Sequence, residues 1–190
     1  MSTTLQHVRF TTAEYTRMAS ILAGRRTELI DGEIIEMAPI GTAHLLVVSR
    51  LQHRFEQGLA SPDVRVLVQQ PLLVDTFDEP QPDLVILREA LGSRKPRVGD
   101  CLVVIEVSDS TYATDVGIKL PAGVPEVWIV NISDHANPMV EVWTPGAGQP
   151  ILAREVVSVA GIAIPLDAIF DHLADIPTDE EHGTRQGSGG

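Results

Sequence analysis

The stretch QPDLVILREALGSRKPRVGDCLVVIEVSDST, residues 81–111, contains two short apolar runs that each carry one acid. Asp83 stands at the start of the first run, and Glu106 lies inside the second, between Ile105 and Val107. Short runs rich in Val, Ile and Leu predict buried β-strands. Burying an unpaired carboxylate costs several kcal/mol, so such a group pairs with a cation, becomes protonated or binds a metal ion.

Three explanations fit the two acids. Divalent cations such as Mg²⁺ prefer carboxylate oxygens, and a bound ion would polarise a phosphoryl oxygen and lower the pKa of a water. Glycosidases also use two carboxylates, but their clefts commonly carry aromatic rings, and only 4% of this chain is aromatic. In the third explanation the acids are structural: Asp83 caps a turn after Pro82, and Glu106 pairs with an arginine.

The composition is that of a globular chain without a membrane segment. Hydrophobic residues make up 44% of the 190 residues, and we expect one domain over residues 1–175. Residues 176–190 are polar and rich in glycine, which predicts a disordered tail. No apolar run reaches the roughly 20 residues of a membrane helix, and the N-terminus lacks the pattern of a secretory signal. The single cysteine, Cys101, fits the protein core and a reducing cytoplasm.

The formal net charge of −12 bears on possible partners. Proteins that bind nucleic acid tightly usually present a basic face, because neutralising phosphates releases counterions. The acidic chain is therefore not expected to bind nucleic acid tightly as a monomer, although a homodimer could frame a cleft and a bound metal would offset the acids locally. The densest basic stretch, residues 88–97, either contacts a phosphate backbone or is a solvated loop.

Periodicity and turn signals predict the remaining elements. Thr11 and Glu14 form a capping box before a helix over residues 12–22, and the pair Asp31-Gly32 predicts a hairpin. Apolar residues at spacings of three and four predict an amphipathic helix over residues 41–60. Strands are expected at 64–75, 82–87, 101–108, 124–132 and 139–145, followed at 151–170 by one or two strands and a short helix. The expected class is α/β, close to α+β, with helices packed on a central mixed sheet.

Six blocks of the sequence carry a family resemblance when they are taken together. They are ELIDGEIIEMAP, GTAHLLVVSRL, QPDLVIL, LVVIEVSDST, DVGIKLP and AGVPEVWIV, in this order. The chain resembles the Uma-two family, a bacterial group similar in fold to the PD-(D/E)XK nucleases, over roughly residues 11–170. The resemblance implies a restriction-endonuclease-like core, a mixed central sheet flanked by helices. It also implies a metal-dependent endonuclease that hydrolyses phosphodiester bonds in nucleic acid, with DNA as the expected substrate.

The resemblance assigns roles to three residues. Asp83 and Glu106 would be ligands of Mg²⁺ or Mn²⁺. In the wider superfamily a lysine normally stands two residues after the second acid, where this chain has Ser108. The family places its lysine on the following helix, and Lys119 occupies that position and would orient the scissile phosphate or the water. A flexible lysine stem can deliver the ammonium from a neighbouring element, although the helix over about 114–120 would be short and end before a proline.

Two further side chains match the family pattern. Glu28 in the predicted hairpin is a candidate fourth polar member of the site, or else an exposed acid at a strand edge. His44 near a helix start would contact a phosphate or a water, or else lie on a solvated face. Gln69 and Gln70 either reach the site or form hydrogen bonds at a strand end.

The sequence leaves two classes of function open. One is a Mg²⁺-dependent cytoplasmic nuclease, expected to be a homodimer. The other is a protein of the same fold that binds a partner or nucleic acid without cutting it. The choice depends on geometry: Asp83, Glu106 and Lys119 must face a common point that can hold a cation.

Overall fold

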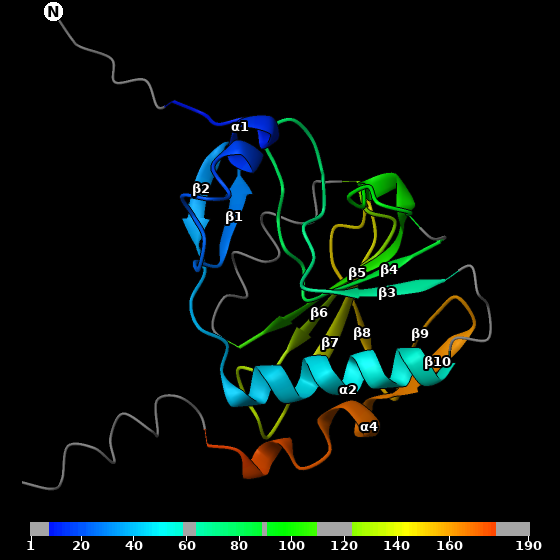
Figure 1. Ribbon diagram of the computed structural model, residues 1–190. Coiled ribbons are helices and arrows are strands. Elements are labelled where there is room, and N and C mark those ends of the chain that lie inside the picture. The colour runs from blue at the N-terminus through cyan, green and yellow to red at the C-terminus, as the bar shows by residue number, and fades with distance from the viewer. Residues whose placement is uncertain (1–7, 59–63, 89–90, 110–122, 178–190) are drawn as a thin grey trace, which may run out of the picture.

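A six-stranded mixed sheet in the order β3-β4-β5-β6-β7-β8 forms the centre of the protein (Figure 1). The computed structural model describes residues 8–58, 64–88, 91–109 and 123–177. β5 and β6 are parallel, and the other neighbours in the sheet are antiparallel. The strands are β3 (Arg65–Val68), β4 (Leu84–Leu87), β5 (Cys101–Ser108), β6 (Val127–Asn131), β7 (Met139–Trp143) and β8 (Ile151–Ala153). The expected mixed central sheet is thus confirmed.

Helices and small hairpins surround this sheet. The long helix α2 (Thr42–Gly58) runs along one face with α4 (Leu166–Phe170) beside it, and α1 (Thr12–Arg17) lies with the hairpin β1–β2 at the opposite end of the view (Figure 1). The smaller sheets are β1 (Thr27–Ile30) with β2 (Glu33–Glu36), and β9 (Val156–Val159) with β10 (Ile162–Pro165). Short 3₁₀ turns occupy Val98–Asp100 and Leu173–Asp175. None of the described helices is both long and apolar enough to cross a membrane.

The central sheet is buried on both faces. On one face, Ile105 and Val107 of β5 belong to the core that packs against α2 and α4. There Phe55 of α2 contacts Trp128 of β6, with ring centroids 6.0 Å apart. Because side chains alternate along a strand, Val104 points to the other face, where a second apolar cluster includes residues of β4 and β6.

Cys101 begins β5 and belongs to this second cluster, as expected of a core residue. Its thiol is fully shielded from solvent, and burial raises the pKa of the thiol to about 12. A thiol with so high a pKa is not a reactive nucleophile at neutral pH, so Cys101 serves the packing of the sheet.

Three elements differ in length from their predictions. The helix expected over 12–22 ends at Arg17, because none of its residues is buried and a short helix needs a packed apolar face to extend. The strand expected over 64–75 ends at Val68, since Gln69 has a positive φ of 50° and Pro71 lacks an N–H. Three strands, β8, β9 and β10, occupy the region where one or two were expected.

Two local signals act as expected. Thr11 and Glu14 form the capping box at the start of α1, with both reciprocal hydrogen bonds present. Asp31 and Gly32 join β1 to β2 with φ angles of 50° and 76°, the left-handed pair of a type I′ turn. The tail predicted from residue 176 lies outside the described residues from 178 onward.

The turn at Gly32 supports a specific stability prediction. A Cβ at Gly32 would lie 2.6 Å from the Cβ of Arg9, in addition to the strain of a positive φ. Gly24 also has a positive φ, of 84°, but nothing lies within 4 Å of an added Cβ. We expect Gly24→Ala to lower the free energy of unfolding by about 1 kcal/mol, and Gly32→Ala by roughly 2–4 kcal/mol because Arg9 must also move.

Chemical denaturation of both variants measures the difference directly. Equal losses for Gly32→Ala and Gly24→Ala would show that Arg9 does not pack against the turn.

Candidate functional site

The two acids lie opposite each other on one face of the central sheet. β4 and β5 are antiparallel with Leu84 opposite Ile105, so Asp83, which precedes β4, stands opposite Glu106. Alternation along each strand places both acids on the same face as Val85 and not on the face covered by α2. The acids are 5% and 3% exposed, so the carboxylates are held in a buried environment.

Asp83 connects four segments through its hydrogen bonds. Its Oδ1 lies 2.9 Å from Nε2 of His44 in the first turn of α2, and its Oδ2 accepts a 2.9 Å bond from the backbone N–H of Val107. Its carbonyl oxygen accepts from the N–H of Gln69, just beyond β3. Asp83 does not merely cap a local turn, because its partners come from α2, β5 and the end of β3.

His44 is largely buried, with a side chain 16% exposed. It therefore does not lie on a solvated face, and its contact with Asp83 gives it a defined place beside the acids. Gln69 and Gln70 make bonds at the strand end: the Gln69 N–H donates to Asp83, and Nε2 of Gln70 donates to the Val68 carbonyl at 3.3 Å.

Glu28 lies in β1 and is only 8% exposed, so it is not an exposed acid at a strand edge. Its Oε1 accepts a 2.6 Å bond from the backbone N–H of Gln81, two residues before Asp83. The side chain of Gln81 donates in turn to the Thr27 carbonyl at 3.3 Å. These contacts bring the hairpin β1–β2 to the segment that leads into β4, and no sequence signal marked Gln81 as the connecting residue.

Two further contacts hold the hairpin, one to the same segment before β4 and one to α1. Leu29 pairs with Glu79 in an isolated bridge. The hydroxyl of Tyr15 donates to the Thr27 carbonyl at 2.6 Å, and burial raises the pKa of this hydroxyl. Glu28 is thus held between α1 and the segment before β4.

Two positions around Glu106 bear on the expected lysine. Lys119 falls in residues 110–122, outside the described residues. Ser108 occupies the position two residues after Glu106, and alternation along β5 points it to the same face. Its side chain is fully buried, and within the part of the chain that the structure describes its hydroxyl has no hydrogen-bond partner.

The donor set fits a hard divalent cation in type. Mg²⁺ commonly takes one or two carboxylates and fills its remaining positions with waters and substrate phosphate. The carboxylates of Asp83 and Glu106 are therefore ligands of the type and number that Mg²⁺ requires from a protein. Among the described residues no group of three or more His, Cys, Asp or Glu side chains is placed to hold a metal ion. Those residues therefore do not form a site in which protein side chains supply most of the metal ligands, as they do in structural zinc sites.

Within the basic stretch at 88–97, Arg94 and Lys95 are exposed, and each is paired with an acid. Arg94 binds Asp100 through two hydrogen bonds of 2.6 and 2.8 Å, and the Arg94 guanidinium lowers the pKa of Asp100 to about 2. Lys95 binds the buried Glu79 with an Nζ–Oε1 distance of 2.5 Å. These ion pairs fix the loop beside β4.

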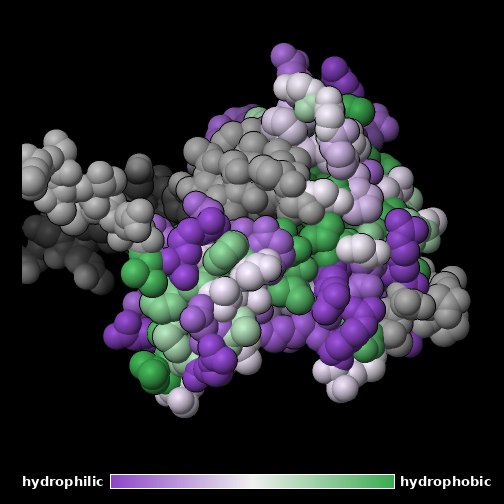
Figure 2. Space-filling view, turned by 90° about the horizontal axis from the view of Figure 1, so that it is seen from above, coloured by the Kyte–Doolittle hydropathy of each residue, from purple (hydrophilic) through white to green (hydrophobic). Residues whose placement is uncertain are grey.

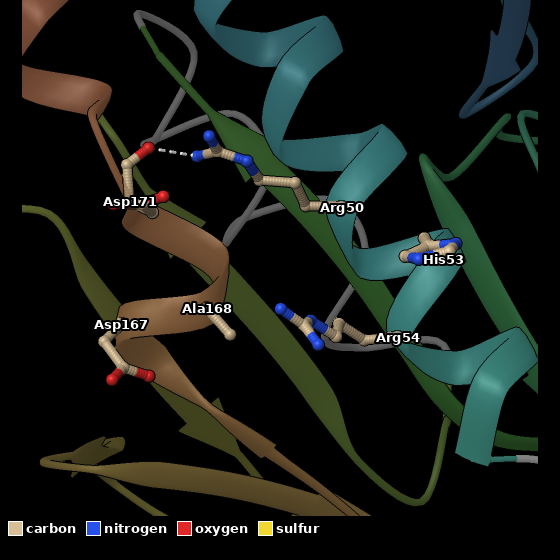
Figure 3. A pocket seen from close by; sticks show the side chains of 6 residues that line it. All are labelled: Arg50, His53, Arg54, Asp167, Ala168 and Asp171. Carbon is tan, nitrogen blue, oxygen red and sulfur yellow. Dashed lines mark hydrogen bonds between the residues drawn. The ribbon is translucent and has the colours of Figure 1, made fainter.

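A separate pocket lies between α2 and α4, lined by Arg50, His53, Arg54, Asp167, Ala168 and Asp171 (Figure 3). Arg50 points from α2 to the end of α4 and donates to the carbonyls of Ile169, at 3.1 Å, and Asp171. Cations commonly satisfy the last carbonyls of a helix, so Arg50 has a structural role there. The pocket is on the α2 side of the sheet, whereas Asp83 and Glu106 face the other side.

Comparisons with known proteins agree with this fold. A family model described as "Uma2: Putative restriction endonuclease" matches residues 12–171. The crystal structure of a "putative nuclease belonging to DUF820" from Anabaena variabilis has a TM-score of 0.67 and 15% sequence identity, over 86% of this chain and 99% of that chain. At this identity the structural likeness shows the fold alone. No curated protein matches the chain.

The buried hydroxyl of Ser108 yields a prediction about stability. An unsatisfied buried hydroxyl opposes folding, so we expect Ser108→Ala to keep the free energy of unfolding or to raise it by up to about 1 kcal/mol. The control is Ser133→Ala, which removes a hydroxyl bonded to Oδ1 of Asn131 at 2.7 Å and should cost about 0.5 kcal/mol.

Urea denaturation of the two variants checks this expectation. A loss above about 1 kcal/mol for Ser108→Ala would mean that the hydroxyl is hydrogen-bonded in solution.

Proposed function

Because the chain belongs to the Uma2 family, described as "Putative restriction endonuclease", we propose that it is a metal-dependent endonuclease that hydrolyses phosphodiester bonds in DNA. The observation that carries this proposal is the opposition of Asp83 and Glu106 on one buried face, at the point where β4 begins. Two carboxylates at neighbouring strands offer the oxygen ligands that Mg²⁺ or Mn²⁺ requires.

In this proposal Asp83 and Glu106 hold the metal ion. The ion would supply Lewis-acid polarisation of the phosphoryl oxygen and a water of lowered pKa. The Val107 N–H and His44 each engage one oxygen of Asp83. Since a carboxylate oxygen has two lone pairs, each can accept such a bond and still face a cation.

His44 acts on Asp83 and is a positioning residue in this scheme. It fixes the rotamer of the carboxylate from the first turn of α2. Partners that orient metal ligands in this way are commonly worth 10–100-fold in metal affinity or activity. Glu28 contributes less directly, because its bond to the Gln81 N–H fixes the backbone that leads into Asp83.

Lys119 completes the proposed machinery on the strength of the sequence alone. Its ammonium would orient the scissile phosphate or the attacking water, as the resemblance implies. We also propose that two copies associate and together frame a cleft for the nucleic acid.

Cleavage of supercoiled plasmid in the presence of Mg²⁺ or Mn²⁺ tests the proposal. We expect Asp83→Asn, Glu106→Gln and Lys119→Ala to abolish nicking, and His44→Asn to slow it about 10–100-fold. Glu155→Gln is the matched control, since it removes one exposed acid far along the chain and should cleave like the wild type. Calorimetric titration with Mn²⁺ should show binding that both carboxylate variants lose.

The same experiment separates the two classes of function. Metal binding without cleavage of any DNA or RNA would favour a protein of the same fold that binds a partner or nucleic acid without cutting it. Wild-type cleavage rates in Asp83→Asn or Glu106→Gln would exclude the proposed metal site.

A further inference from the structure

A groove of about 700 Å³ runs beside the edge strand β3, and its lining has an unusual charge for this protein. Of the residues that the structure describes along this groove, three, Arg65, Arg94 and Lys95, carry cationic side chains and none is acidic. The whole chain by contrast carries 26 acids against 14 Lys and Arg residues. On so acidic a protein, a described lining that contains three cations marks a place suited to a polyanion.

The groove lies on the same face of the sheet as the two acids. Its floor contains Leu67 of β3 and Leu87 of β4, which pack with the cluster on the face opposite α2. Asp83 shares that face, and Leu87 is about 13 Å further along the chain at the rise of a β-strand. Gln70 also lines the groove and follows Gln69, whose N–H donates to Asp83.

The cations on the rim are held so that they face solvent. The Arg94 side chain is 46% exposed and its partner Asp100 is 16% exposed. Lys95 is 43% exposed, whereas its partner Glu79 is 3% exposed. The acids therefore lie beneath the cations and orient them. An ammonium has three N–H donors, and Lys95 uses two of them, on Glu79 and on the Thr16 hydroxyl, so one is left for a further acceptor.

The apolar floor completes the match to a nucleic-acid strand. Leu67, Pro71, Leu87, Leu91 and Pro96 line it together with the cationic rim. The C–H groups of the sugars present apolar surface beside the phosphates, which a wholly hydrophilic groove would not accommodate. From above, hydrophilic and apolar side chains are interspersed over the described surface, with no single apolar patch dominating it (Figure 2).

Resting on the proposed function, we propose that this groove binds the sugar-phosphate backbone of the substrate strand next to the cleaved bond. Arg94 and Lys95 contact phosphates, and the floor receives the sugars. The contacts fix the register of the strand and carry no sequence information of their own. Because the cations are few, binding is weak at physiological salt and strengthens as the salt concentration falls.

Fluorescence anisotropy with labelled duplex and single-stranded oligonucleotides in EDTA tests the groove without cleavage. The variants are Arg94→Gln/Asp100→Asn and Lys95→Gln/Glu79→Gln, each of which removes a cation together with its own partner acid. Each double variant keeps the net charge of the protein unchanged and leaves no acid without its cationic partner. Circular dichroism checks that both double variants are folded. If Lys95→Gln/Glu79→Gln does not fold, Arg94→Gln/Asp100→Asn, whose acid is less buried, carries the test alone.

We expect each pair to weaken binding about three- to tenfold at 50 mM salt. The slope of log K against log salt should fall in magnitude by about 0.9 per lost contact on duplex and about 0.7 on a single strand. The oligonucleotide that loses more affinity, duplex or single-stranded, is the form that the groove binds. The control Arg154→Gln removes an exposed arginine after β8, at the other edge of the sheet, and should keep the wild-type slope.

Failure of this proposal is distinguishable from failure of the nuclease assignment. Wild-type affinity and slope in both groove variants, with wild-type cleavage present, would overturn the groove alone. A reduced slope in a protein that cleaves nothing would support the groove and overturn the nuclease. Absence of any binding by the wild type would overturn the groove, and the plasmid assay would still decide the nuclease assignment by itself.

Discussion

The buried carboxylate of Asp83 is the constraint on which the candidate site depends. A charge at 5% exposure requires donors to replace water, and a charge-assisted bond to each oxygen meets that need. The donors here are Nε2 of His44 and the N–H of Val107, which belong to α2 and β5. Satisfying one side chain therefore requires the first turn of the long helix to meet the end of the central sheet. The sequence separations of 39 and 24 residues make these long-range contacts that form only with the whole fold.

The placement of Glu106 across from Asp83 raises the electrostatic cost of the same arrangement. Two like charges opposite each other in an antiparallel pair repel, and a buried setting screens that repulsion less than water does. The fold tolerates this because Asp83 is held by its donors and because β4, which follows Asp83, and β5 are packed on both faces. A cation between the acids would convert the repulsion into attraction. Charged residues that destabilise the ligand-free fold but interact favourably with a bound ligand are typical of functional sites.

Local patterns in the sequence predict the type and order of most elements and the opposition of the two acids, but not every element boundary. The period-two alternation of β5 put Glu106 on one face, and the Asp31-Gly32 pair specified the hairpin turn. The environment of Glu28 could not be read from its neighbours, because its burial arises from packing against residues some 50 positions later. The end of β3 was also misjudged, since a positive φ at Gln69 is not marked by glycine. The role of Lys119 stays a prediction, because it rests on sequence order and not on a described contact.

The loop at 91–100 shows why net charge is a poor guide to where a polyanion binds. Arg94, Lys95 and Arg97 carry three positive charges, and Asp100 together with Glu79, from the segment before β4, offsets two of them. The structure separates the signs by depth, with each acid less exposed than its cation, so the outer surface presents the cations. A phosphate interacts most strongly with the charges closest to it, and screening over about 8 Å at physiological ionic strength reduces the influence of distant acids. An acidic chain can thus present a local basic surface, at the cost of burying carboxylates that only paired cations can stabilise.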